Sequence, residues 1–255
     1  MNKKVCVIIP IYKSKLDPYE KLSINLTEKK LSCFDIYFIT YRELNLKNYK
    51  EYRNIKVMYF PKKFFKNTIS YSRLLLKEGF YKKFIAYSYM LIVQTDALIL
   101  GDAKQLDNFI NKRFDYWGAR WAKPVEIHSF EVNKGMKKII MERYPDFIVN
   151  RVFKNPKYCT VGNGGLSLRN IKKTINLIRD KKAYAAVWLG NEDKFFAYYG
   201  LDNNVNYRLA PASEVDKFSL ESFIKQSLND VKPFGVHAWE SKGKKQVLCY
   251  LDGMR

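Results

Sequence analysis

The stretch FIAYSYMLIVQTDALIL, from Phe84 to Leu100, decides the fold. Its aromatic and β-branched residues, and the continuous apolar run before Gln94, predict a strand that is buried on both faces. An ionised Asp96 at the end of such a run is costly to bury unless a charge or hydrogen-bond donors meet it. We therefore expect Asp96 to lie where the strand ends, in the crevice where open α/β sheets bind ligands. The alternative is that Asp96 caps a turn or pairs with a buried arginine.

Three shorter apolar runs precede this strand and also predict strands. They are Lys4–Tyr12, Phe34–Thr40 and Asn54–Phe60. Pro10 and Pro61 suit strand ends because proline has no N–H to donate. Helices are expected over Leu16–Lys30 and over Ser70–Tyr81, the second with Gly79 as its stop signal. Strands that alternate with helices predict an α/β fold with a mostly parallel sheet flanked by helices.

The second half of the chain has a less regular pattern. The aromatic run Phe114–Trp121 predicts a strand and turn beside a ligand. Helices are expected around Lys134–Arg143, over Ile171–Lys182 with Asn170 as its cap, and from Asn191 to Gly200. Two segments are predicted to be loops, Pro211–Phe223 and Pro233–Glu240. Because neither a repeat nor a low-complexity linker divides the chain, we expect a single compact domain.

The composition is strongly basic. The 255 residues carry 46 Lys and Arg against 25 Asp and Glu, a net charge of +21. Such a charge suits nucleic acid, an anionic membrane surface or a phosphorylated ligand. The lysines are dispersed in pairs, and no nucleic-acid-binding motif is present, so we expect no nucleic-acid partner. An anionic membrane surface stays open as a partner.

The cysteines and the apolar runs bear on the compartment. The four cysteines are scattered without a CxxC pair, so we expect reduced thiols. Apolar runs stay shorter than the roughly 18–20 residues that a spanning helix needs, and the start of the chain lacks the features of a secretory signal. These features predict a cytoplasmic protein, with peripheral attachment to the inner membrane face as a further possibility.

Four short segments place polar groups among glycines and aromatic residues, as a binding crevice requires. They are QTD at 94–96, GNGG at 162–165, NED at 191–193 and GVHAW at 235–239. Each has a purely structural alternative. GNGG can be a tight turn, and acidic residues in a first helical turn are favoured by about 0.3–1 kcal/mol. His237, one of two histidines, can equally be a structural residue.

Longer motifs that contain these segments resemble a known family. In chain order they are YSRLLLKEGFY, YSYMLIVQTDALIL, DYWGARW, VGNGGLSLRN, GNEDKFF, APASEVDKFSLES and PFGVHAWE, over roughly residues 70–240. Together they are similar to a bacterial family of glycosyltransferases with a GT-A-type fold, long carried as a domain of unknown function. The resemblance implies that residues 1–100 bind a nucleotide sugar and residues 101–255 bind the acceptor.

The resemblance also implies a donor site. QTD stands where GT-A enzymes carry Asp-x-Asp, so Asp96 and His237 would hold Mn²⁺ or Mg²⁺. Gln94 replaces the first carboxylate, which leaves metal dependence open, with a basic side chain as the alternative. The donor, with a UDP-sugar favoured, would contact Pro10, Ile11, Tyr12, Gln94, Thr95, Asp96, Asn163, Gly164 and Gly165.

On the acceptor side, the resemblance makes Asp193 the base that takes the hydroxyl proton. Glu192 would bind the acceptor or exchange that catalytic role with Asp193. Trp117 and Trp239 would offer apolar faces to the sugar. The expected function is inverting hexosyl-type transfer to a glycan or lipid-linked acceptor in bacterial surface polysaccharide synthesis (capsule, O-antigen or lipooligosaccharide). The alternative is a non-catalytic nucleotide- or carbohydrate-binding module on a degenerate transferase fold.

Overall fold

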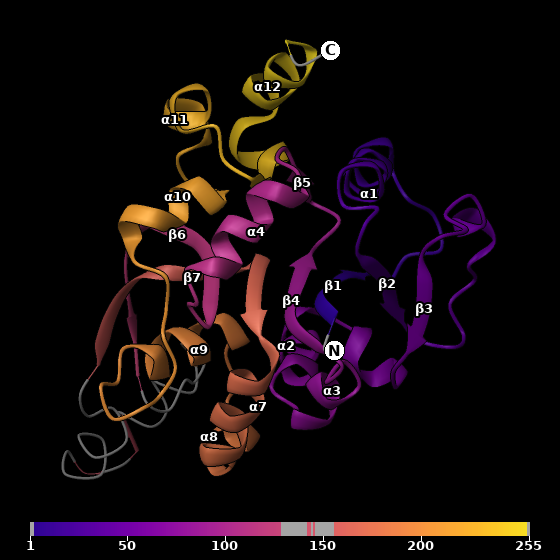
Figure 1. Cartoon of the computed structure of the whole chain (residues 1–255). Coiled ribbons are helices and arrows are strands. Elements are labelled where there is room, and N and C mark those ends of the chain that lie inside the picture. The colour runs from indigo at the N-terminus through magenta and orange to yellow at the C-terminus, as the bar shows by residue number, and fades with distance from the viewer. Residues whose placement is uncertain (1–2, 129–141, 144, 146–155, 254–255) are drawn as a thin grey trace.

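A six-stranded sheet runs through the molecule in the order β3-β2-β1-β4-β7-β6 (Figure 1). The computed structural model describes residues 3–128, 142–143, 145 and 156–253. The strands are β1 Lys3–Pro10, β2 Asp35–Thr40, β3 Lys56–Tyr59, β4 Tyr87–Val93, β6 Tyr116–Ile127 and β7 Lys157–Asn170. β1 to β4 pair in parallel, whereas β7 is antiparallel to both β4 and β6. The predicted α/β fold with a mostly parallel sheet is confirmed, and both halves of the chain contribute to this one sheet.

The strand that was expected over Phe84–Leu100 is two strands. β4 ends at Val93, and β5 Ala97–Ile99 belongs to a second sheet of order β5-β9-β8. The turn between them is closed by a 2.9 Å hydrogen bond from the Ala97 N–H to the Gln94 carbonyl. The single-strand prediction is wrong because apolar residues on both sides of the turn are buried in different sheets.

Burial on both faces of the central strands is confirmed. Val7 of β1 and Leu91 of β4 lie in the apolar core on one side of the sheet. Ile8 and Ile92, which form the next register pair of the two parallel strands, lie in the core on the other side. Because successive side chains of a strand point to opposite faces, a continuous apolar run fills both cores.

Helices cover both faces of the sheet. One core includes residues of α1 Pro18–Lys30, α4 Ala103–Asn111 and α10 Ala212–Phe218. The other includes residues of α2 Thr68–Leu75, α3 Glu78–Lys82, α7 Ile171–Asp180 and α9 Glu192–Gly200. The second sheet, with β8 Ser219–Leu220 and β9 Gly235–His237, packs with α11 Ile224–Val231 and α12 Trp239–Asp252 around a third core. The remaining helical elements are α8 Lys182–Val187 and two short 3₁₀ turns, Lys47–Tyr49 and Lys62–Phe65.

Several helix starts follow from local chemistry. The Asn170 side chain accepts from the Lys173 N–H at 3.1 Å and caps α7, as predicted. Asp17 and Glu20 form a reciprocal capping box at the start of α1. α9 begins after Asn191 and includes Gly200 as its last residue, close to the predicted range.

Other element predictions need correction. The helix expected over Ser70–Tyr81 is split into α2 and α3 because Lys77 has an extended backbone, and Gly79 lies inside α3 instead of ending a helix. The segment Pro211–Phe223 contains α10 and β8, and Pro233–Glu240 contains β9, so neither is a plain loop. The helix expected around Lys134–Arg143 falls almost entirely outside the described residues.

Two predictions from composition meet the structure directly. Cys6, Cys33, Cys159 and Cys249 are all free thiols. Within the part of the chain that the structure describes, every helix is too short or too polar to cross a bilayer.

Candidate functional site

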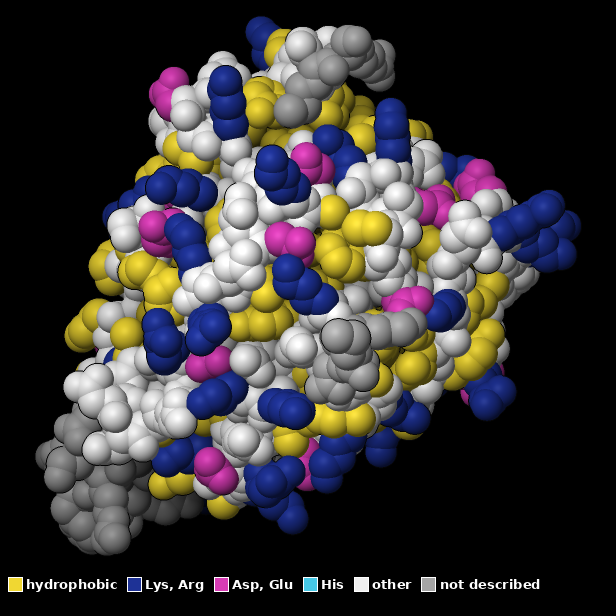
Figure 2. Space-filling view, in the orientation of Figure 1, with side chains coloured by type: hydrophobic (Ala, Val, Ile, Leu, Met, Phe, Trp, Pro, Cys, Tyr) yellow, Lys and Arg dark blue, Asp and Glu magenta, His cyan; other side chains and the backbone are white. Residues whose placement is uncertain are grey.

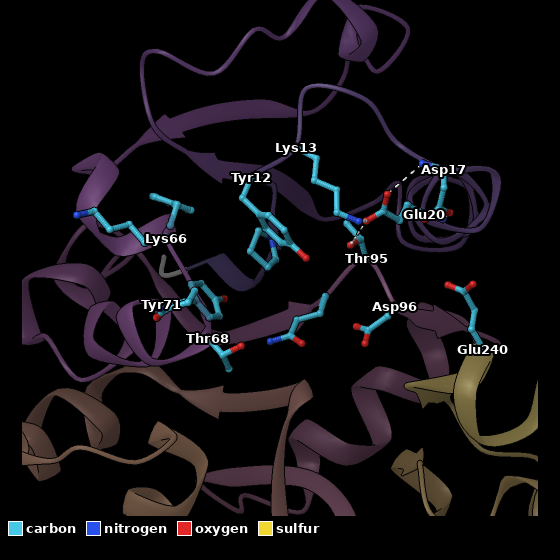
Figure 3. A pocket seen from close by; sticks show the side chains of 14 residues that line it. Tyr12, Lys13, Asp17, Glu20, Lys66, Thr68, Tyr71, Thr95, Asp96 and Glu240 are labelled. Carbon is cyan, nitrogen blue, oxygen red and sulfur yellow. Dashed lines mark hydrogen bonds and ion pairs between the residues drawn. The ribbon is translucent and has the colours of Figure 1, made fainter. Parts of the chain in front are cut away.

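A cleft of about 400 Å³ opens at the carboxyl ends of β1 and β4 (Figure 3). Its lining comes from the end of β1, the first turns of α1, α2 and α12, and the β4–β5 turn. The lining residues are Pro10, Tyr12, Lys13, Asp17, Glu20, Phe65, Lys66, Asn67, Thr68, Tyr71, Gln94, Thr95, Asp96 and Glu240. This is the crevice in which open α/β sheets bind ligands.

Asp96 lies in this cleft, directly after β4 and its turn. Its side chain is 49% exposed, and its Oδ1 is 3.3 Å from Nε2 of His237. Burial raises the pKa of Asp96, but the facing imidazole outweighs it and leaves this pKa below its ordinary value. The predicted position at a strand end is confirmed, and the ion-pair partner is His237 instead of an arginine.

His237 reaches Asp96 because β9 pairs antiparallel with β5, which places His237 opposite Ala97. Its other ring nitrogen, Nδ1, is 3.8 Å from Oε2 of Glu221. Burial lowers the pKa of His237, but the two carboxylates more than compensate and raise it to about 9. Neither ring nitrogen has a hydrogen-bond partner among the described residues.

The Asp96–His237 pair fits part of a divalent metal shell. A carboxylate and an imidazole are ligands that Mn²⁺ accepts, and the two facing atoms are close enough to share one ion. A carboxylate behind the imidazole, here Glu221, is the usual support of a metal-binding histidine. Within the described residues, no group of three or more His, Cys, Asp or Glu side chains converges. Diphosphate oxygens and water would therefore have to complete the shell.

The GNGG segment lies within β7 and is not a turn. The Gly165 carbonyl accepts from the Gln94 N–H at 2.9 Å, which joins the segment to the β4–β5 turn. A Cβ on Gly165 would stand 1.9 Å from Nε2 of His237, and one on Gly164 would stand 3.3 Å from Cβ of Asp193. Successive residues of a strand face opposite sides. The two glycines therefore let His237 and Asp193 approach the backbone of β7.

The predicted donor contacts in this segment lie beside the cleft. Asn163, Gly164 and Gly165 are absent from the cleft lining. The Asn163 side chain instead accepts from the Gly165 N–H at 3.1 Å. Their contact with a donor stays a prediction.

Glu192 and Asp193 open α9, and the structure separates their roles. Glu192 is buried, and its two oxygens accept from Arg169 at 2.8 Å and from the Ser72 hydroxyl at 2.7 Å. The structure thus shows Glu192 in a buried structural pair, and its contact with an acceptor or its role as a base stays a prediction. Asp193 is also buried, and its Oδ1 accepts from the Lys194 N–H. Burial, with the charge of Glu192, raises the pKa of Asp193 to about 7.

Trp117 and Trp239 have no exposed surface. Trp117 packs against Phe109 and Phe114 in the core, and Trp239 meets the ring of Tyr19 edge-on. This burial contradicts the prediction that either indole offers a face to an acceptor sugar. Large aromatic residues supply much of the apolar area of a core, and both indoles are used here for core packing instead of for ligand contact.

Of the donor contacts predicted at the end of β1, Pro10 and Tyr12 lie in the cleft and Ile11 does not. Tyr12 is 51% exposed and lines the cleft together with Pro10. Ile11 has its side chain in the core and its N–H bonded to the Ile39 carbonyl. A side-chain contact between Ile11 and a donor is therefore excluded.

Sequence reasoning missed several cleft residues. Lys13 donates to Oε1 of Glu20 at 2.8 Å, and the Thr95 hydroxyl donates to the same oxygen at 3.2 Å. Across the cleft, Lys66 makes no ion pair with any described residue, and the Tyr71 hydroxyl is buried without a partner there. Two sequence features could have indicated them. Lys13 directly follows the first expected strand, and Asp17 and Glu20 have the spacing of a capping box.

Comparison with known proteins places the chain. A family model described as a protein of unknown function, DUF5672, matches residues 54–237. The chain belongs to this family. Comparison with curated proteins gives no match.

Among solved structures, the apo form of mouse xyloside xylosyltransferase 1 is similar to this DUF5672 protein. The two chains are 9% identical, and the match covers 95% of this chain and 99% of the other with a TM-score of 0.50. At this identity the likeness shows a shared fold, a GT-A-like single α/β domain, and no more than the fold.

Proposed function

We propose that this DUF5672 protein is a glycosyltransferase that moves a sugar from a nucleotide-sugar donor to a glycan or lipid-linked acceptor. The observation that carries the proposal is Asp96, which lines a cleft at the carboxyl ends of parallel strands and lies 3.3 Å from the buried His237. The fold shared with a xylosyltransferase supports the same class of chemistry. Carboxylate, imidazole and unpartnered polar atoms around one cleft are what an anionic, metal-associated ligand requires.

The donor, with a UDP-sugar favoured, would lie between Tyr12 and Asp96, with its nucleotide toward the exposed Tyr12 ring. Lys13 and Lys66 line the same cleft and would meet phosphate oxygens. Asp96 and His237 would hold Mn²⁺ or Mg²⁺, which when bound neutralises the charge of the leaving diphosphate.

The proposed transfer inverts the configuration at the anomeric carbon. The acceptor oxygen forms a bond to the anomeric carbon while the bond from that carbon to the phosphate oxygen breaks. The nucleoside diphosphate leaves with the electron pair. The hydroxyl proton passes to the Asp193 carboxylate, which the acceptor would reach from the Gly164 side of β7, outside the lining of the cleft. A base whose pKa is about 7 is well matched to neutral pH, where part of the population is ionised and ready to accept a proton.

The acceptor side of the proposal rests on charge and family resemblance. Lys and Arg side chains are spread over the face seen in Figure 2, with acidic side chains between them. A net charge of +21 suits work at an anionic membrane surface, and each lysine near such a surface contributes about 1 kcal/mol. We propose bacterial surface polysaccharide as the product and peripheral contact with the membrane as the setting.

One observation favours a second function, a non-catalytic nucleotide- or carbohydrate-binding module. Gln94 stands in the cleft where a second carboxylate would strengthen metal binding. A module of this kind would bind a nucleotide sugar without releasing free nucleotide.

A ligand panel tests both functions. Thermal midpoints are measured with nucleotide sugars, with and without Mn²⁺, since a ligand that binds the folded state raises the midpoint. Nucleotide release is then followed with candidate acceptors. The transferase predicts acceptor-dependent release that is lost in Asp193→Asn with donor binding kept. Asp230→Asn, an exposed substitution on α11, is the matched control. Donor binding without release in any acceptor panel supports the module, and no binding of any nucleotide sugar overturns both.

A further inference from the structure

The first turn of α9 is fastened to the rest of the molecule by a buried ion pair. Arg169 of β7 has no exposed surface, and its Nη2 donates to Oε1 of Glu192 at 2.8 Å. The other oxygen of Glu192 accepts from the Ser72 hydroxyl of α2 at 2.7 Å. The Glu192 carboxylate therefore links α9 to β7 and α2, and Asp193 is the next residue of the chain.

The guanidinium of Arg169 is held on every side. Its Nη1 donates to the Tyr81 hydroxyl at 2.9 Å, and its Nε donates to the Ser167 hydroxyl at 3.2 Å. Its Cζ atom lies 5.3 Å from the Tyr116 ring centre and 5.0 Å from the Phe196 ring centre. A planar fork with several donors suits this enclosure in a way that a lysine ammonium does not.

Stability alone is a weak reason for such a pair. Replacing a buried ion pair with apolar side chains of similar volume is often neutral or stabilising. The position next to Asp193 suggests another role. Gly164 admits all three side chains, since a Cβ there would lie 3.0 Å from Glu192, 3.1 Å from Arg169 and 3.3 Å from Asp193.

The charged and titratable groups around Asp193 come from three elements. They are Glu192 and Lys194 of α9, Arg169 of β7 and Tyr116 of β6. Arg169 balances the charge of Glu192 at contact distance. A small displacement of the first turn of α9 would change the distances from the Asp193 carboxylate to Arg169 and Tyr116, which belong to other elements.

We propose that Arg169 is a positioning residue, which acts through Glu192 to fix the first turn of α9 and thereby the place of the Asp193 carboxylate beside Gly164. This positioning role rests on the proposed function only in its consequence for catalysis, where Asp193 is the proton acceptor. The placement of Asp193 is a property of the ligand-free protein. Ser72 and Tyr81 complete the support from α2 and α3.

The test uses Arg169→Lys, which keeps the positive charge and loses the planar fork. The Asp193 carboxyl is followed by ¹³C NMR titration of the ligand-free protein, with its signal assigned by Asp193→Asn. We expect the Asp193 pKa to fall by at least about one unit from about 7, because a loosened first turn lets water reach the carboxyl. Arg120→Lys is the matched control, since Arg120 makes a two-bonded pair with Asp216 of α10.

The second readout is turnover. In Arg169→Lys we expect the transfer rate kcat to fall by about a hundredfold, as for a reacting group misplaced by about 1 Å. The donor KM should stay within about threefold of that of the original protein, and the thermal shift caused by nucleotide should be unchanged. Neither Arg169 nor Glu192 lines the cleft.

The two readouts separate the failures. An unchanged Asp193 titration in Arg169→Lys overturns the positioning role, whatever the protein does with sugars. If the titration moves but the unaltered protein transfers no sugar, the proposed function fails and the positioning role stands. Should Arg169→Lys fold poorly, the volume-matched double variant Arg169→Met with Glu192→Met replaces it, with hydrogen exchange at Lys194 as the readout. Exchange there must then rise at least about tenfold, and wild-type exchange overturns the proposal.

Discussion

Two carboxylate–cation pairs of this protein have opposite surroundings. The Asp96–His237 pair lies at the cleft, with half of the Asp96 side chain exposed and both ring nitrogens of His237 lacking a hydrogen-bond partner among the described residues. The Arg169–Glu192 pair is buried, and both oxygens of Glu192 are bonded. A pair with unused bonding capacity can receive a ligand, whereas a satisfied pair holds structure.

The largest expected effect is on the buried pair. Arg169→Ala would leave the Glu192 charge uncompensated in the core, at a cost of about 3–5 kcal/mol in unfolding free energy. Urea unfolding measures this. Asp96→Asn, at the Asp96–His237 pair, should cost less, because Asp96 is half exposed to water and Glu221 still faces His237 in this variant. Equal losses in the two variants would contradict the distinction between the pairs.

The Asp96–His237 pair should make the free energy of unfolding depend on pH. The pKa of His237 is raised to about 9 from its ordinary 6.5. The folded state therefore holds this proton more tightly than the unfolded state. The resulting stabilisation is complete below pH 6.5 and is lost as the pH rises to about 9. We expect a loss of at most about 3 kcal/mol, which is absent in His237→Gln. Thermal midpoints from pH 6 to 10 check it, and an identical slope in both proteins would contradict it.

The next effect probes how close the Asp96–His237 pair lies to β7. Gly165→Ala would place a methyl group 1.9 Å from Nε2 of His237. We expect a loss of about 1–3 kcal/mol, as for other overpacked sites, together with weaker nucleotide-sugar binding.

Gly79→Ala is the matched control for that substitution. No atom lies within 4 Å of the added methyl group, and Gly79 is in α3. A gain of about 0.5–1 kcal/mol is expected there, because alanine is the better helix former. If both glycine variants behave alike in urea unfolding, His237 does not pack on Gly165.

The smallest expected effect concerns the residue after His237. Ala238 has φ 50 and ψ 30, a left-handed conformation that costs an L-residue about 1–2 kcal/mol. Ala238→Gly relieves this strain but gains chain entropy in the unfolded state. We expect a net gain of about 0.5 kcal/mol in unfolding free energy with the nucleotide thermal shift unchanged. A loss of stability would show that the methyl group of Ala238 contributes packing.

Part of the site followed from local patterns. The apolar run before Gln94 identified β4, and the cost of burying a charge placed Asp96 at its end. The structure brings the four polar segments together at β7, where Gly165 faces His237 and accepts from the Gln94 N–H, and Gly164 faces Asp193. Their individual roles were less accessible, because Glu192 and Asp193 are adjacent acidic residues with the same local signal.

The sequence by itself determined the parallel strands β1 to β3, the existence of β4 and the cap of α7, because periodicity, proline and capping side chains act within a few residues. Only the tertiary structure decided which carboxylates stay open. Glu192 is closed by Arg169 and Ser72, which lie 23 and 120 positions away, while Asp96 is left half exposed beside His237. The indoles of Trp117 and Trp239 are likewise buried by side chains from other elements. Whether a polar or aromatic side chain meets water or the core depends on what the rest of the chain packs against it, and no local pattern encodes that.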